Sequence, residues 1–338
     1  MKLGTSLGNK NTAFKAGAVI LGIFAFAMLP SFFKSIGSTM FLATEIFIFA
    51  IFALGFNLLL GFTGIISFGH AAWFGLSSYA AALFQRHITP DSTLLPLLFG
   101  ICFTTLIGAL VGRLIIKTRG IYFAYVTIAF SQLVLFIIIR WTKLTNGENG
   151  LGGIERKPLF RVIDIAPEFN YYIFVVVIFI LVFILLNIII KSPFGRVLQA
   201  IRENRTRAIF VGYNVRSYEL TSYILSVFFT SVAGVLDVFL LKYAFPESMA
   251  TTMSGEVIIM TLVGGMHSLT GPVLGALIIT FLKDFISSFT DRWMIFLGGI
   301  FVIFVMVFPE GIMGFFGKRN GSNPFKALLP KRDKESES

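Results

Sequence analysis

The chain has 338 residues, of which 56% are hydrophobic and 13% are charged, and its formal net charge is +11. Soluble domains carry charge on about a quarter of their residues, so this composition argues against a water-soluble fold. The basic residues lie between apolar runs instead of on one polar face, which argues against nucleic acid as a partner. The composition predicts an all-α protein that crosses a membrane many times.

Apolar segments long enough, or nearly long enough, to span a bilayer follow one another along the chain. A hydrocarbon core of about 30 Å needs ~20 helical residues, and the eighth segment is short by that measure. We interpret the first segment as a retained anchor and not as a cleaved secretion signal, because further spans follow it. The predicted fold is a polytopic membrane helix bundle of about ten spans with short, glycine-broken helices, at 17–36, 40–60, 64–85, 93–116, 121–140, 171–190, 218–241, 254–266, 269–288 and 293–308.

The positions of lysine and arginine predict the orientation, because positively charged loops stay in the cytoplasm. Reading 254–288 as one broken span would place the basic tail outside, so we interpret it as two short crossings. The resulting segments are a cytoplasmic N-terminus at 1–16, a transmembrane domain at 17–308 and a cytoplasmic, disordered tail at 309–338. Within the domain, 142–170 is predicted to be an external loop and 191–217 a basic cytoplasmic loop.

Glycine interrupts two of the apolar stretches, at 61–70 and at 263–275. Such interruptions can loosen a membrane helix and offer backbone groups to a polar ligand, and paired ones point to a substrate pathway. The alternative is close helix packing through small residues. The candidate substrate-path residues are Thr63, Gly64, Ser67, Gly69 and His70 in the first stretch and Gly264, Gly265 and Gly271 in the second.

Polar residues inside the predicted spans form a second candidate set, namely Glu45, Asn57, Glu219, Asp237 and Glu256. Because an ionisable group in hydrocarbon is costly, each is expected to face the bundle interior or a membrane interface. Glu219 and Glu256 fall near span ends, which favours the interfacial position for both. Glu45 and Asp237 lie deeper, where either could meet a substrate ammonium group or pair with a neighbouring helix.

The sequence lacks the arrangements on which enzymes and metal sites depend. There is no Walker lysine loop, so the chain cannot by itself cradle ATP phosphates. His70, His87 and His267 have no metal-ligand spacing with cysteine or acidic residues, and Cys102 is alone. We therefore expect neither a catalytic site nor a bound metal.

Distinctive motifs occur in four stretches: NLLLGFTG at 57–64 with SFGHAAWFG at 67–75, TNGENGL at 145–151, SPFGR at 192–196 with AIRE at 200–203 and GYNV at 212–215, and GGMHSLTGPVLG at 264–275. In motif, order and spacing they resemble the LivM-type permease subunits of the branched-chain amino-acid ABC transporters. The resemblance implies a permease subunit that translocates leucine, isoleucine or valine across the bacterial cytoplasmic (inner) membrane. It implies that separate subunits use ATP and that this chain binds no cofactor itself.

The partners implied by the resemblance are a LivH-type sister permease, two cytoplasmic ABC ATPase subunits and an extracytoplasmic substrate-binding protein, besides membrane lipid. The resemblance also implies that 196–215 couples to an ATPase, with Gly195, Arg196, Arg202, Glu203 and Gly212 as the coupling candidates. A surface helix with apolar residues Val197, Leu198, Ile201, Ile209 and Phe210 could seat in a partner groove. The alternative is a basic helix lying on anionic lipid.

The stretch 205–210 departs from the family pattern, and so does Asp237, where an aromatic or small residue is more usual. A urea or short-amide permease of the same superfamily shares the architecture and stays an alternative. An ion-coupled secondary transporter is a less favoured one, in which Glu45 and Asp237 would be the coupling carboxylates.

Overall fold

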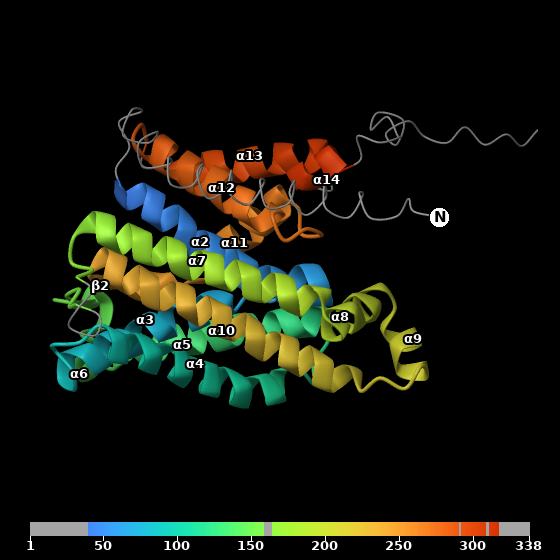
Figure 1. The fold of residues 1–338 in the computed structure, drawn as a ribbon, viewed down its shortest axis with the longest axis horizontal. Helices are drawn as coiled ribbons and strands as arrows, with labels where there is room; N and C mark the ends of the chain where they lie inside the picture. The colour runs from blue at the N-terminus through green and yellow to red at the C-terminus, as the bar shows by residue number, and fades with distance from the viewer. Residues whose placement is uncertain (1–39, 159–163, 291, 309–310, 318–338) are drawn as a thin grey trace, which may run out of the picture.

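The structure is a computed structural model that describes residues 40–158, 164–290, 292–308 and 311–317. The expected first span at 17–36, the N-terminus at 1–16 and the chain beyond 317 lie outside these residues. Helices dominate the part of the chain that is described (Figure 1).

Long apolar helices form most of the fold. They are α2 (Met40–Asn57), which continues as the π-helix η1 (Leu58–Thr63), α4 (Leu94–Ile115), α5 (Ile121–Arg140), α7 (Glu168–Lys191) and α10 (Val215–Leu241). Counting α2 and η1 as one, these are the 5 helices among the described residues that are long and apolar enough to cross a membrane. The remaining helices of the bundle are α3 (His70–His87), α11 (Thr251–Gly264), α12 (Gly271–Ser287) and α13 (Trp293–Val307). The prediction of an all-α, multi-pass membrane bundle is confirmed.

Shorter elements lie at the two ends of the long helices, which we call the α6 end and the α8 end (Figure 1). The α6 end carries α6 (Thr142–Thr145), η2 (Gly147–Asn149), η3 (Pro246–Met249) and the strands β1 (Leu151–Gly152) and β2 (Tyr243–Ala244). The strands pair antiparallel, with Leu151 opposite Ala244. The α8 end carries α8 (Pro193–Glu203) and α9 (Arg205–Phe210), and α14 (Gly311–Gly317) follows α13. The loops predicted to be external and cytoplasmic thus lie at opposite ends of the bundle.

Helix α2 forms the centre of the bundle because it is apolar on every face. From Ile46 to Asn57 every residue is buried, and α7, α10, α11 and α12 pack around it. Peripheral helices instead expose one apolar face: Leu106, Leu110 and Leu114 recur along α4 and are more than half exposed. Such a face needs lipid to cover it.

The third helix begins later than the sequence predicted, at His70 instead of residue 64. Residues 64–69 are not helical, because Gly64 ends η1 with a φ of 80°, a left-handed conformation that favours glycine. The segment 64–69 then lies against α5, where the backbone N–H of Phe68 donates to the Thr127 hydroxyl at 3.1 Å.

The basic loop at 191–217 forms two helices where the sequence predicted one surface helix. Ser192 caps α8, with a proline at its first position, and the side chain of Asn204 accepts a hydrogen bond from the backbone N–H of Arg207 to start α9. The expected apolar face is therefore divided. Leu198 is buried in the main core, and Val197 and Ile201 pack with Ala208 of α9 and Val215 of α10, whereas Ile209 and Phe210 stay exposed.

Candidate functional site

A buried polar seam runs between η1, α3 and α10, and we define it by Thr63, His70, Ser222 and Ser226. The hydroxyls of Thr63 and Ser222 lie 2.6 Å apart, and Nε2 of His70 lies 2.8 Å from Oγ of Ser226. All of these side chains are at most 3% exposed. Two segments that are 150 or more residues apart in sequence thus present their polar groups to each other inside an apolar bundle.

The hydrogen bonds of the seam fix the proton on His70. The Ser226 hydroxyl donates its single proton to the Gly55 carbonyl at 2.6 Å, so His70 must donate from Nε2 to Ser226. Because the ring is fully buried and no counter-charge contacts it among the described residues, the neutral form is favoured, and its Nδ1 then carries an acceptor lone pair without a described partner. Oδ1 of Asn57 and Oγ1 of Thr230 are also buried without a described partner. Buried polar atoms of this kind are costly unless something hydrogen-bonds to them.

Helices α11 and α12 form an antiparallel hairpin whose tip, 265–270, lies near the α8 end. A Cβ on Gly275 would lie 2.7 Å from the carbonyl carbon of Met260, and one on Gly264 would overlap the carbonyl of Gly271. The glycines therefore allow the two helix backbones to touch. Asn57 ties this hairpin to the central helix, because its Nδ2 donates to the Ser268 carbonyl at 3.1 Å.

Arg202 of α8 joins the two glycine-interrupted stretches at a place that we call the Arg202 junction. Its Nη1 donates to the carbonyl of Gly61 in η1, and its Nη2 lies 2.6 Å from Nε2 of His267 at the hairpin tip. A Cβ on Gly64 would lie 3.0 Å from Cγ of Arg202. Burial lowers the pKa of the Arg202 guanidinium and Glu203 opposes that shift, but a guanidinium stays protonated at neutral pH. A π-helical turn, which is common at functional sites, thus receives a fixed positive charge.

Charged side chains form a layer near the α6 end, and we call it the charged layer: Glu45 of α2, Asp237 of α10, Glu256 of α11 and Lys283 of α12. Nζ of Lys283 lies 3.1 Å from Oε2 of Glu256. Asp237 is 7% exposed. Glu219, the remaining acid predicted inside a span, lies at the opposite end, where Nε of Arg205 donates to its Oε1 at 2.7 Å.

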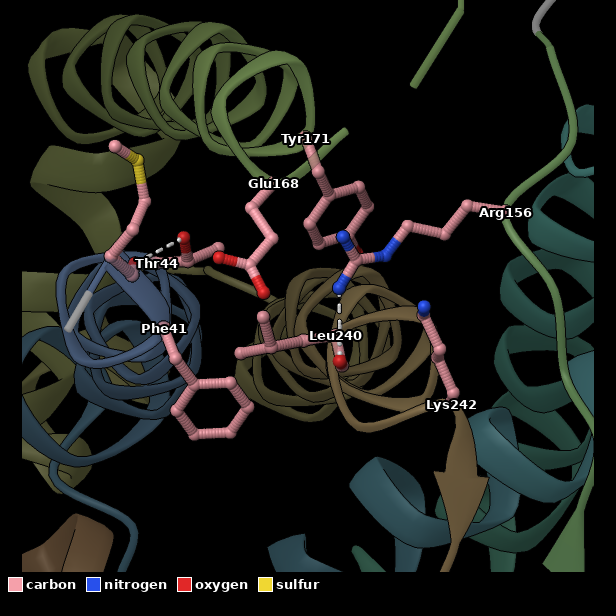
Figure 2. Close-up of a pocket in the computed structure, with 8 residues that line it drawn as sticks. Phe41, Thr44, Arg156, Glu168, Tyr171, Leu240 and Lys242 are labelled. Carbon is pink, nitrogen blue, oxygen red and sulfur yellow. Dashed lines mark hydrogen bonds between the residues drawn. The ribbon is translucent and has the colours of Figure 1, made fainter. Parts of the chain in front are cut away.

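A small pocket of about 80 Å³ opens beyond the charged layer at the α6 end (Figure 2). Arg156 forms one wall: its Nε and Nη2 donate to the carbonyls of Phe239 and Leu240 at 2.7 and 3.0 Å. The guanidinium also lies 4.1 Å from the ring centroid of Tyr171, whose hydroxyl donates to the Leu236 carbonyl. Arg156 thus satisfies carbonyls that the end of α10 would otherwise leave unpaired. Two of its five N–H donors are thus used to hold the end of α10 in place.

The sequence model of a protein family described as "Branched-chain amino acid transport system / permease component" matches residues 38–305. The chain belongs to this family. It is therefore a transporter component and not an enzyme. No solved structure matches the chain.

Relatives of this permease carry matching names. The LivM permease of the high-affinity branched-chain amino acid transport system of Escherichia coli K12 is 25% identical over 308 residues, which cover 81% of this chain and 70% of the relative. The LivM protein of Salmonella typhimurium is 25% identical over 318 residues, or 87% and 74% of the two chains. A probable LivH protein of Methanocaldococcus jannaschii is 25% identical over 327 residues, or 85% and 96%.

The structure of the permease distributes the predicted path residues over four places. Thr63 and His70 lie in the seam, Asn57, Gly64, Gly264, Gly265 and Gly271 lie near the hairpin tip, and Glu45, Asp237 and Glu256 lie in the charged layer. Ser67 and Gly69 belong to the non-helical segment before α3, where the backbone N–H of Gly69 lies 3.4 Å from Oγ of Ser67. Among the residues described, no group of three or more histidines, cysteines or acids could hold a metal ion.

Of the coupling candidates, Arg202 reaches into the bundle and the others do not. Arg196 and Glu203 are exposed, Gly195 packs on the end of α7 at the carbonyl of Ile190, and Gly212 has a φ of 99°. Sequence reasoning did not single out Ser222, Ser226 or Lys283. The serines recur four residues apart on α10, a spacing that would have placed them on one helix face.

Proposed function

We propose that this permease is one membrane subunit of an ABC importer for leucine, isoleucine or valine. The observation that carries the proposal is the family match over residues 38–305. The proposed partners are a LivH-type sister permease, two cytoplasmic ATPases and an extracytoplasmic binding protein, and the chain itself uses no cofactor. The apolar outer faces of α4, α5 and α7 fit a subunit embedded in the bacterial cytoplasmic membrane.

The proposed topology has about ten crossings with both termini in the cytoplasm, so that the α8 end is cytoplasmic and the α6 end external. The antiparallel α11–α12 hairpin supports the interpretation of 254–288 as two short crossings. In this topology 142–170 receives the binding protein and 191–217 contacts an ATPase.

The proposed mechanism is alternating access. The seam is closed and buried in this conformation, and the Arg202 junction holds η1 and the hairpin tip together at the cytoplasmic side. ATP-driven movement of α8 would pull on Arg202, and through it on both segments. The unpartnered atoms of His70 and Asn57 would then find water or substrate as the seam opens.

Labelling of a single introduced cysteine tests the topology. Glu148 is exposed in η2 at the α6 end, so a Glu148→Cys protein in a Cys102→Ala background should react with a membrane-impermeant maleimide added outside intact cells. The matched control is Lys117→Cys in the same background, which lies in the exposed turn between α4 and α5 and should react after the cells are opened. Labelling of Glu148→Cys from the cytoplasmic side alone would overturn the orientation.

Uptake by the reconstituted complex tests the substrate and the energy source. We expect radiolabelled leucine to accumulate in proteoliposomes that contain the permease, its sister subunit, the ATPases and the binding protein, with a strict requirement for ATP. Accumulation of urea and not leucine would identify the amide transporter of the same superfamily. Uptake that survives ATP depletion and collapses with an ion gradient would identify a secondary transporter.

A further inference from the structure

The charged layer brings four side chains from different helices to one depth of the bundle. Glu45 and Glu256 each lie five residues after the start of their helix, and Asp237 and Lys283 each lie four residues before the end. At a rise of about 1.5 Å per residue, each Cα is roughly 6–8 Å from the α6 end of its helix. Because α2 contacts α10, α11 and α12, these side chains converge around the central helix.

The layer holds three acidic side chains and one basic side chain. Glu256 is paired with Lys283, but among the described residues no hydrogen-bond donor or cation lies within bonding distance of the carboxyl groups of Glu45 and Asp237. An unpaired carboxylate in a membrane bundle is costly and marks a functional site by default. Asp237, which is 7% exposed, is the most strongly buried of these acids.

We propose that the charged layer binds the head group of the transported amino acid. In this arrangement Lys283 receives the α-carboxylate, and Asp237, Glu45 and the released Glu256 receive the α-ammonium group. The inference rests on the proposed function and names the residues that recognise the substrate. A zwitterion carries one charge of each sign, so it can divide the Glu256–Lys283 pair and give each partner a new counter-ion.

The surroundings of Lys283 also fit the apolar side chain of such an amino acid. Its Nζ lies 4.9 Å from the ring centroid of Trp293 and 5.8 Å from that of Phe49, which places apolar walls beside the carboxylate position. The Lys283 side chain keeps 28% of its surface exposed, so it is not sealed by the described residues. A neutral amide such as urea would gain no charge partner from dividing the ion pair, so the layer favours an amino acid.

The pocket in Figure 2 lies beyond the charged layer, at the same helix ends, and is not the proposed position of the substrate carboxylate. Thr44, which lines it, precedes Glu45, and Leu240 lies about one turn beyond Asp237. The Arg156 guanidinium points at the end of α10 and is used by two backbone carbonyls (Figure 2). Among the described residues at this end, Lys242 lines the pocket, whereas Lys283 is the cation that lies within the charged layer itself, beside Glu256.

The test compares leucine uptake with ATP hydrolysis in the complete reconstituted complex. Asp237→Asn should lower leucine uptake about tenfold, because an ammonium partner is lost, and Lys283→Gln should lower it about ten- to a hundredfold. In both variants the stimulation of ATP hydrolysis by the loaded binding protein should stay within about twofold of the parent, since neither residue lies near the α8 end. Asp91→Asn, in the exposed turn before α4, and Lys117→Gln are the matched controls and should change neither measurement.

If Lys283→Gln folds poorly, Asp237→Asn alone tests the proposed binding of the head group. Replacing an unpaired buried acid with an amide of nearly the same shape should leave the thermal midpoint of the complex unchanged or raised, so a fall in uptake cannot then come from unfolding. Uptake by Asp237→Asn equal to that of the parent would overturn the inference. Failure of the parent complex to accumulate leucine would instead overturn the proposed function.

Discussion

In Arg202→Ala, leucine uptake by the reconstituted complex is expected to fall at least about tenfold while ATP hydrolysis continues. The substitution removes the two hydrogen bonds that join α8 to the Gly61 carbonyl and to His267. Bonds from a charged donor each contribute about 1.5–3 kcal/mol, so their loss disconnects α8 from the segments it is proposed to move. Parallel measurement of uptake and of ATP consumed per leucine transported would reveal the uncoupling.

Two further variants separate coupling from a general loss of positive charge. Arg113→Ala removes an exposed arginine from the end of α4 at the same side of the bundle and should leave uptake unchanged. Arg202→Lys keeps the charge but cannot reproduce the planar fork that reaches two acceptors, so it should rescue little. Full uptake by Arg202→Ala would show that α8 drives the permease through other contacts.

The membrane spans could be predicted from the sequence because each one is recognisable from its own run of residues. With no water in the hydrocarbon, a run of apolar residues must satisfy its backbone within a helix, and hydropathy alone finds it. The helices α4, α5 and α7 begin and end within a few residues of the predicted limits. The start of the third span was misplaced by six residues, because Gly64 and Gly69 continue an apolar run while the backbone between them is not helical.

The candidate site could be predicted only in part, because the sequence of one helix does not show which residues of another helix it contacts. Thr63 and His70 stood out beside glycines, but their partners Ser222 and Ser226 lie on α10 within an ordinary apolar span. Lys283 was overlooked near the end of a predicted helix, where a lysine is usually interfacial. Its proposed role depends on Glu256, 27 residues away, and the α11–α12 hairpin brings the two together.

The hairpin is also where the smallest substitution is expected to have the largest structural effect. Gly275→Ala should prevent the close contact of α11 and α12 and lower the free energy of unfolding by about 1–3 kcal/mol or more. The new Cβ would lie 2.7 Å from the carbonyl carbon of Met260 and 3.0 Å from the backbone nitrogen of Gly264. These are backbone atoms, which cannot turn aside as a flexible side chain can. A fall in the thermal midpoint of the purified permease in detergent would measure the loss.

Gly255→Ala on α11 is the matched control, because a Cβ there meets nothing within 4 Å. Both substitutions improve helix propensity by up to about 1 kcal/mol, so Gly255→Ala should leave the thermal midpoint unchanged or raise it while Gly275→Ala lowers it. The two variants therefore differ only in what the methyl group touches. A midpoint for Gly275→Ala at or above that of Gly255→Ala would mean that the helices are not in backbone contact. The hairpin tip would then lack the fixed geometry on which the proposed role of Asn57 and Arg202 depends.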